Sequence, residues 1–96
     1  MHVGVARVAL RLPENGSLKG KRMVVKSVAQ RVRNRFNVAI AEINTQDAWD
    51  VITLGIVCLS DDPRHSNEIL SKVIDFIESE RLDADVGEVA MELIAV

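Results

Sequence analysis

Hydrophobic residues recur along this chain at two spacings, and the changes between them divide the sequence into six predicted elements. Alternation of apolar and polar residues predicts strands, whereas apolar residues three and four positions apart predict amphipathic helices. The predicted strands are Val3–Leu12, Val38–Ile43, Val51–Leu59 and Val86–Ala95, and the predicted helices are Leu18–Phe36 and Pro63–Glu80. The element order is therefore β-α-β-β-α-β.

Local signals mark where both helices begin. Pro13–Gly16 is a cluster of turn-forming residues, and Ser17 follows it as the expected N-cap of the first helix. Asp62 stands directly before Pro63, and an acidic cap followed by a proline is typical of a helix start. The apolar stripe of the first helix is formed by Val24, Val25, Val28, Val32 and Phe36.

The element order predicts one architecture. Two right-handed crossovers place both helices on one face of a four-stranded antiparallel sheet. This is an α+β fold, a ferredoxin-like βαββαβ sandwich. The chain has 96 residues and shows no internal repeat or linker, so residues 1–96 are expected to form a single domain.

The sheet face without helices is predicted to carry both charged and apolar residues. Arg7 and Arg11 of the first strand point to this face. The last strand, its expected neighbour, contributes Glu88 and Glu92, so cross-strand ion pairs are expected with the two arginines. The apolar residues expected there are Val38, Ile40 and Val57. Because exposed apolar patches mark association, we expect a homodimer or larger assembly through this open sheet face.

Charge is distributed very unevenly along the chain. Residues 1–41 hold nine Lys and Arg against one acid, whereas residues 42–96 hold three against thirteen, so a net charge of −2 conceals a strongly basic first part. A concentrated basic segment attracts polyanions, nucleic acid above all. The alternative is a solvated helix face whose positive charges are neutralised by the acidic part of the same fold.

The basic residues of the first helix gather beside its apolar stripe. At 100° per residue, Lys19, Arg22, Lys26 and Arg33 fall within an arc of about 60° and span about 21 Å. Lys21 and Arg35 are expected on the other flank of the stripe, with Arg31 slightly further round. The free N–H groups of the helix start, together with Lys19, Lys21 and Arg22, also form a candidate anion site. Ordinary capping beside solvated lysines is the alternative.

Other chemistry finds little support in the sequence. RNA-recognition motifs share this topology and stack bases on strand aromatics, but His2–Leu12 and Val51–Leu59 contain none. No zinc-type spacing and no nucleophile–base set stands out, so we expect a non-enzymatic protein without cofactor or metal. Cys58, the single cysteine, is expected to be a buried hydrophobe. Trp49 is either an interface anchor or a cover for the hairpin end.

No signal peptide or membrane-spanning stretch is visible in the sequence, so the expected location is the cytoplasm.

Several stretches together resemble one known family. They are Ser17–Arg22, Arg35–Glu42, Asp47–Trp49, Leu54–Ile56 and Asn67–Glu78. On these residues the chain resembles the YlxP-like family, small bacterial proteins classed as a domain of unknown function. The resemblance implies a ferredoxin-like fold and a gene that often lies near translation-initiation and ribosome-maturation factors. Gly20 departs from the acidic residue expected there, so a capping box cannot form and the helix start should be more positive.

These observations favour a small accessory protein that contacts ribosomal or other structured RNA. The expected phosphate contacts are Lys19, Lys21, Arg22, Lys26 and Arg33, with Arg31 and Arg35 second in rank. Two alternatives remain. One is a dimeric small-molecule-binding regulatory module of ACT-like topology, and the other is a protein–protein adaptor that uses the acidic second helix and Trp49.

Overall fold

The computed structural model describes residues 1–13, 16–80 and 84–96. Its elements are β1 (His2–Arg11), α1 (Leu18–Arg35), β2 (Ala39–Glu42), β3 (Val51–Ser60), α2 (Pro63–Ser79) and β4 (Asp85–Ala95). The predicted elements and their order are confirmed, with ends that differ by at most one residue, as helix and strand termini commonly do. Two parts of the predicted connections, Glu14-Asn15 and Arg81–Asp83, lie outside the described residues.

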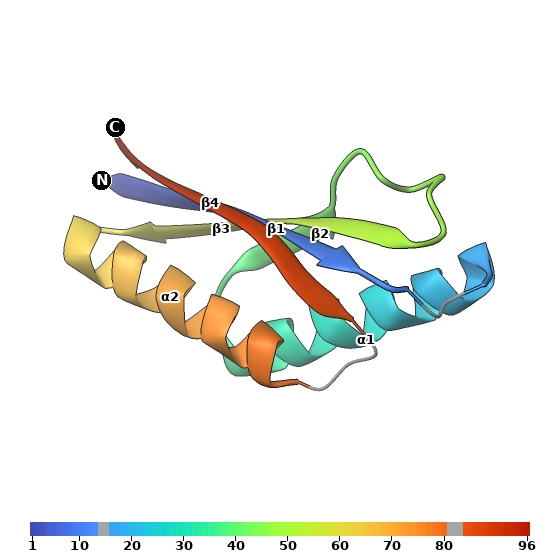
Figure 1. The fold of residues 1–96 in the computed structure, drawn as a ribbon. Helices are drawn as coiled ribbons and strands as arrows, with labels where there is room; N and C mark the ends of the chain where they lie inside the picture. Colours follow the sequence, from blue (N-terminus) through green and yellow to red (C-terminus); the bar gives the residue numbers. More distant parts are fainter. Residues whose placement is uncertain (14–15, 81–83) are drawn as a thin grey trace.

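The four strands form one antiparallel sheet in the order β2-β3-β1-β4. Both helices lie on the same face of this sheet, and the opposite face carries no helix (Figure 1). The predicted ferredoxin-like βαββαβ sandwich is therefore confirmed. The two ends of the chain meet at one corner of the sheet, where the amide N–H of Val96 donates to the carbonyl of Met1 at 2.8 Å. No helix within the described ranges is long and apolar enough to cross a membrane.

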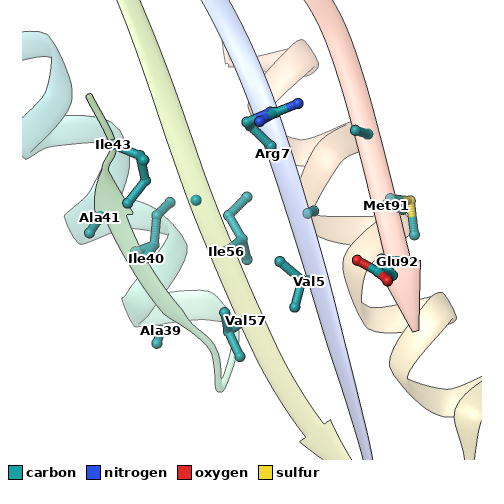
Figure 2. Close-up of a pocket in the computed structure, with 13 residues that line it drawn as sticks. Val5, Arg7, Ala39, Ile40, Ala41, Ile43, Ile56, Val57, Met91 and Glu92 are labelled. Carbon is teal, nitrogen blue, oxygen red and sulfur yellow. The ribbon is translucent and has the colours of Figure 1, made fainter. Parts of the chain in front are cut away.

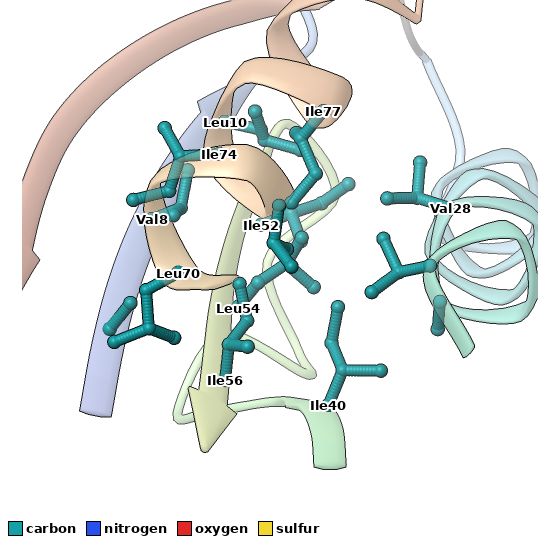
Figure 3. Packing of buried hydrophobic residues seen from close by; sticks show 14 of the residues in the cluster. Val8, Leu10, Val28, Ile40, Ile52, Leu54, Ile56, Leu70, Ile74 and Ile77 are labelled. Atoms are coloured by element: carbon teal, nitrogen blue, oxygen red, sulfur yellow. The ribbon is translucent and has the colours of Figure 1, made fainter. Parts of the chain in front are cut away.

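The core lies between the sheet and the two helices. Alternate residues of β1 and β3 point into it, and α2 and α1 close it from the other side (Figure 3). The side chains of Val8, Ile52, Leu54, Leu70 and Ile77 are fully buried. Burying each of these stabilises the fold by roughly 1.5–3 kcal/mol relative to an exposed position. Cys58 is a free, buried cysteine of this core, as predicted.

A close approach fixes where α2 crosses the sheet. A Cβ atom at Gly4 of β1 would lie 2.8 Å from Leu70 Cδ1 and 3.1 Å from Cys58 Sγ. Any other residue at this position would require the Leu70 side chain or α2 to shift. The first half of α2 therefore sits directly on β1 and β3, and β4 lies beyond it at the sheet edge.

The two helix starts are capped as predicted, one by a neutral group and one by a charged group. Ser17 Oγ accepts the Gly20 N–H at 3.0 Å, and Asp62 Oδ1 accepts the Arg64 N–H at 2.9 Å. The backbone N–H of Arg64, followed by its side chain, lowers the pKa of the Asp62 carboxyl. Since this folded-state pKa lies below the unfolded value, the stabilising effect is present above the unfolded pKa and is lost as pH falls through the folded one.

Candidate nucleic-acid interface

One side of α1 presents a row of cations to solvent. We call Lys19, Arg22, Lys26 and Arg33 the outer basic flank, and all four side chains are exposed. Within the described residues, no carboxylate forms an ion pair with any of them. Arg33 is anchored by its Nη2, which donates to the Ile40 carbonyl at 2.9 Å. The flank is therefore open to an external anion, and α1 holds its members on one side of the helix.

Lys21 does not belong to this surface. The prediction that it contacts phosphate is wrong, because its side chain is fully buried, with 0% exposed. Its Nζ lies 2.8 Å from Glu42 Oε2 on β2. A buried ammonium is stable only when it is paired and hydrogen-bonded, and here both conditions are met inside the fold.

The partners of Lys21 come from the β2–β3 connection. Lys21 Nζ also donates to the carbonyl of Thr45 and, at 3.4 Å, to that of Val51. Thr45 Oγ1 donates to Glu42 Oε2 at 2.7 Å and accepts the Thr53 N–H at 2.9 Å. Glu42 and Thr45 thus accept hydrogen bonds from the Lys21 ammonium, and their contacts connect α1, β2 and β3. This set of Lys21, Glu42 and Thr45 is the Lys21 network.

Backbone geometry brings Thr45 back to Glu42. Asn44 has a φ of 62°, in the left-handed region that asparagine tolerates better than most residues. Gln46 Nε2 then donates to the Glu42 carbonyl at 3.1 Å and closes the turn. Local sequence does not reveal this network, because Lys21 lies more than 20 residues before Glu42 and Thr45. One sign of it is visible in the sequence: Lys21 lies four and seven residues before Val25 and Val28, a spacing that places all three on the same side of the helix.

The two second-rank arginines are held by the fold. Arg31 Nη1 lies 2.8 Å from Glu80 Oε1, although the arginine side chain remains 59% exposed. Arg35 stacks over the Phe76 ring, with its Cζ 5.1 Å from the ring centroid. Both guanidinium groups already have an internal partner, so neither joins the outer basic flank.

The predicted ion pairs on the open sheet face do not form. The β1–β4 pairing places Arg7 opposite Ala90 and, beyond a register shift between Val8 and Leu10, Arg11 opposite Asp85. Within the described part of the chain neither arginine forms an ion pair. The interpretation of these arginines as partners of Glu88 and Glu92 is therefore wrong.

The apolar patch on that face also differs from the prediction. Ile40 pairs with the core residue Ile56 and is buried on the helix side, and Val38 packs against the core. Their neighbours Ala39 and Ala41 are exposed instead. The open face contains a hollow of about 690 Å³ (Figure 2). Its lining includes Val5, Arg7, Ala39, Ile43, Val57 and Glu92.

Among the described residues, no group of three His, Cys, Asp or Glu side chains lies close enough to hold a metal ion. His65 is exposed on α2. Asp83 lies outside the described residues. Trp49 is 51% exposed in the β2–β3 connection.

Comparisons with known proteins agree with this description. The model of the family described as "Protein of unknown function (DUF503)" matches residues 3–91. The chain is 39% identical over 77 residues to "Uncharacterized protein YlxP" of Bacillus subtilis (strain 168), a match that covers 80% of this chain and 84% of that protein. A de novo designed protein with ferredoxin fold, solved by solution NMR, is similar in structure with a TM-score of 0.52. That match covers 100% of this chain and 87% of the designed chain at 14% identity, so it supports the fold alone.

Proposed function

The chain belongs to the DUF503 family, whose function is unknown, and we propose that it is a non-enzymatic accessory protein that binds ribosomal or other structured RNA. Lys19, Arg22, Lys26 and Arg33 contact phosphates along one side of α1. Sequence-independent phosphate contacts of this kind position a protein on a folded polyanion without reading its bases.

The observation that carries the proposal is the contrast among the cations of α1. Lys21, Arg31 and Arg35 have partners inside the fold, whereas Lys19, Arg22 and Lys26 form no ion pair within the described residues. No acid among the described residues therefore forms an ion pair with the outer basic flank. An exposed row of cations on a rigid helix is a suitable surface for successive phosphates.

The sheet favours structured RNA over unpaired bases as the ligand. Single-strand readers with this topology stack bases on aromatic residues of the two central strands. The residues of β1 and β3 that face away from the helices are Val3, Val5, Arg7, Ala9, Arg11, Val51, Thr53, Gly55, Val57 and Leu59, and none is aromatic. The phosphates of a folded RNA are then the feature that this surface suits best.

The experiment is sedimentation of the tagged protein with ribosomes and with purified structured RNA at low and at high salt. Wild-type protein should co-sediment at low salt and be released at high salt, because phosphate contacts release counterions. The variant with Lys19→Ala, Arg22→Ala and Lys26→Ala should lose co-sedimentation with all of the RNAs about equally.

The matched control removes the same charge from cations with internal partners. It combines Arg31→Ala, Arg64→Ala and Lys72→Ala, each of which pairs with an acid of the fold. This control should co-sediment nearly as the wild type does. Equal binding by both triple variants would refute the assignment of the outer basic flank.

A second candidate function is a small-molecule-binding regulatory module, favoured by the hollow on the open sheet face. Its volume of about 690 Å³ lies in the range of small-molecule sites, and its apolar lining includes one exposed cation, Arg7. Glu92 also lines the hollow, so such a site suits a small, largely apolar molecule whose carboxylate binds Arg7 on the side away from Glu92. A carboxylate metabolite that raises the melting temperature of the wild type but not of Arg7→Gln, without RNA binding at low salt, favours this candidate over the first.

A further inference from the structure

The two edges of the sheet are very different. β2 forms one edge and has four residues, whereas β4 forms the other and has eleven. Within the described residues β4 pairs with β1 alone, so its outer side carries unpaired backbone N–H and C=O groups. A long free edge of this kind is a template for pairing with another strand.

The side chains of β4 are also left uncovered on the helix side. Val89 and Met91 stand opposite Val8 and Ala6 of β1, so they share the core-facing side of the sheet. Val8 and Ala6 are 0% and 1% exposed, but Val89 and Met91 are both 38% exposed. Leu93, next in the same row, is 42% exposed. The helices pack on the central strands and leave this apolar row open.

From Val89 onward the free edge has one charged residue, Glu92, and few of the features that usually prevent pairing. Natural edges are protected by lysine, proline or bulges. Residues 85–96 contain no lysine and no proline, and the register shift of β4 lies before Val89. From Val89 to Ala95 the strand is therefore regular, apolar on its helix side and open to a partner strand.

We propose that a second copy of this chain pairs with β4 in antiparallel orientation, with the two-fold axis at Met91. The result is one continuous eight-stranded sheet with all four helices on the same face. In this register Val89 lies opposite Leu93 of the second copy, and Met91 lies opposite its own equivalent. Glu88 lies opposite Ile94, and Glu92 opposite Ala90.

The distribution of charge selects this register. With the axis at Ala90, Glu88 would face Glu92 of the second copy, and with the axis at Glu92 that residue would face itself. Like charges directly opposite each other destabilise a strand pair. An axis at Val89 would place Leu93 opposite Asp85. Of the axes from Val89 to Glu92, only the one at Met91 joins the apolar row to itself and keeps both glutamates away from like charges.

A cysteine placed on the axis tests this geometry. Opposite residues of an antiparallel pair have Cα atoms about 4.5–5.5 Å apart, which is within the range that a disulfide spans. Met91→Cys should therefore form a disulfide-linked dimer rapidly on mild oxidation. Met23→Cys is the control, since Met23 is 65% exposed on α1 and Cys58 is buried in both variants. Equal cross-linking of the two variants would overturn the proposal.

Sedimentation equilibrium of two lysine variants distinguishes a dimer formed through the β4 edge from a dimer formed through the open sheet face. Met91 and Val57 are 38% and 40% exposed, and Val57 lies on the open sheet face. The wild type and Val57→Lys should be dimers at micromolar concentration, whereas Met91→Lys should be a folded monomer by circular dichroism. A monomeric wild type, or a dimer that Val57→Lys breaks and Met91→Lys does not, would contradict the proposal.

Discussion

Lys19 and Lys21 lie two residues apart on the same helix and occupy opposite environments. Lys21 is fully buried with its Nζ 2.8 Å from Glu42, whereas Lys19 is exposed and forms no ion pair within the described residues. One lysine joins three elements of the fold, and the other is available to an external ligand. A basic segment in a sequence therefore overstates the charge that the folded surface presents.

The geometry of the helix explains the difference. At 100° per residue, Lys21 is in line with Val25, Val28 and Val32, at the centre of the buried stripe of α1. Lys19 lies about 160° away from it around the helix. A lysine at the centre of an apolar stripe must find an acid within the fold, because an unpaired buried charge is too costly. Glu42 of β2 is that acid.

The largest effect is expected from breaking the buried pair. Lys21→Ala leaves Glu42 without its cation and should lower the free energy of unfolding by about 3–5 kcal/mol. Lys19→Ala should change it by less than about 0.5 kcal/mol, as exposed substitutions usually do. Urea denaturation followed by circular dichroism measures both.

The double variant Lys21→Met/Glu42→Leu sharpens this comparison. Replacing both charges by apolar groups of similar size should restore much of the lost stability, since no buried charge remains unpaired. If Lys21→Ala proves as stable as Lys19→Ala, Lys21 is not structural and the contrast between the two lysines is wrong.

Periodicity was enough to predict the six elements, because each buried stripe repeats within its own segment. Properties that depend on pairing between distant segments were not predictable in this way. Ile40 was assigned to the open face, but β2 has only four residues, and its register against β3 decides which way Ile40 points. The register of β4 against β1 likewise places Ala90 and Asp85, instead of Glu88 and Glu92, opposite Arg7 and Arg11.

The candidate site was predicted in part. Helical spacing grouped Lys19, Arg22, Lys26 and Arg33 correctly on one exposed side. The prediction of Lys21 on the other flank of the stripe is wrong, because its side chain is buried in line with Val28 and Val32. Its partners Glu42 and Thr45 are brought close by the fold, so local sequence did not identify them.

The smallest effect is expected at the exposed ion pair of the same helix. Arg31 and Glu80 are 59% and 23% exposed, and surface pairs contribute about 0–1 kcal/mol. Arg31→Ala should therefore shift the free energy of unfolding by no more than about 1 kcal/mol, and by less at high salt. If Arg31→Ala lowered the free energy of unfolding as much as Lys21→Ala does, solvent exposure would not explain the difference between the two ion pairs.

The most direct test of the outer basic flank is the salt dependence of binding to one structured RNA. Each phosphate contact contributes about −0.9 to the slope of log K against log salt on a duplex. The variant with Lys19→Ala, Arg22→Ala and Lys26→Ala should have a slope shallower than that of the wild type by about 2–3. The control with Arg31→Ala, Arg64→Ala and Lys72→Ala should keep the wild-type slope. Equal slopes for all three proteins would contradict the account.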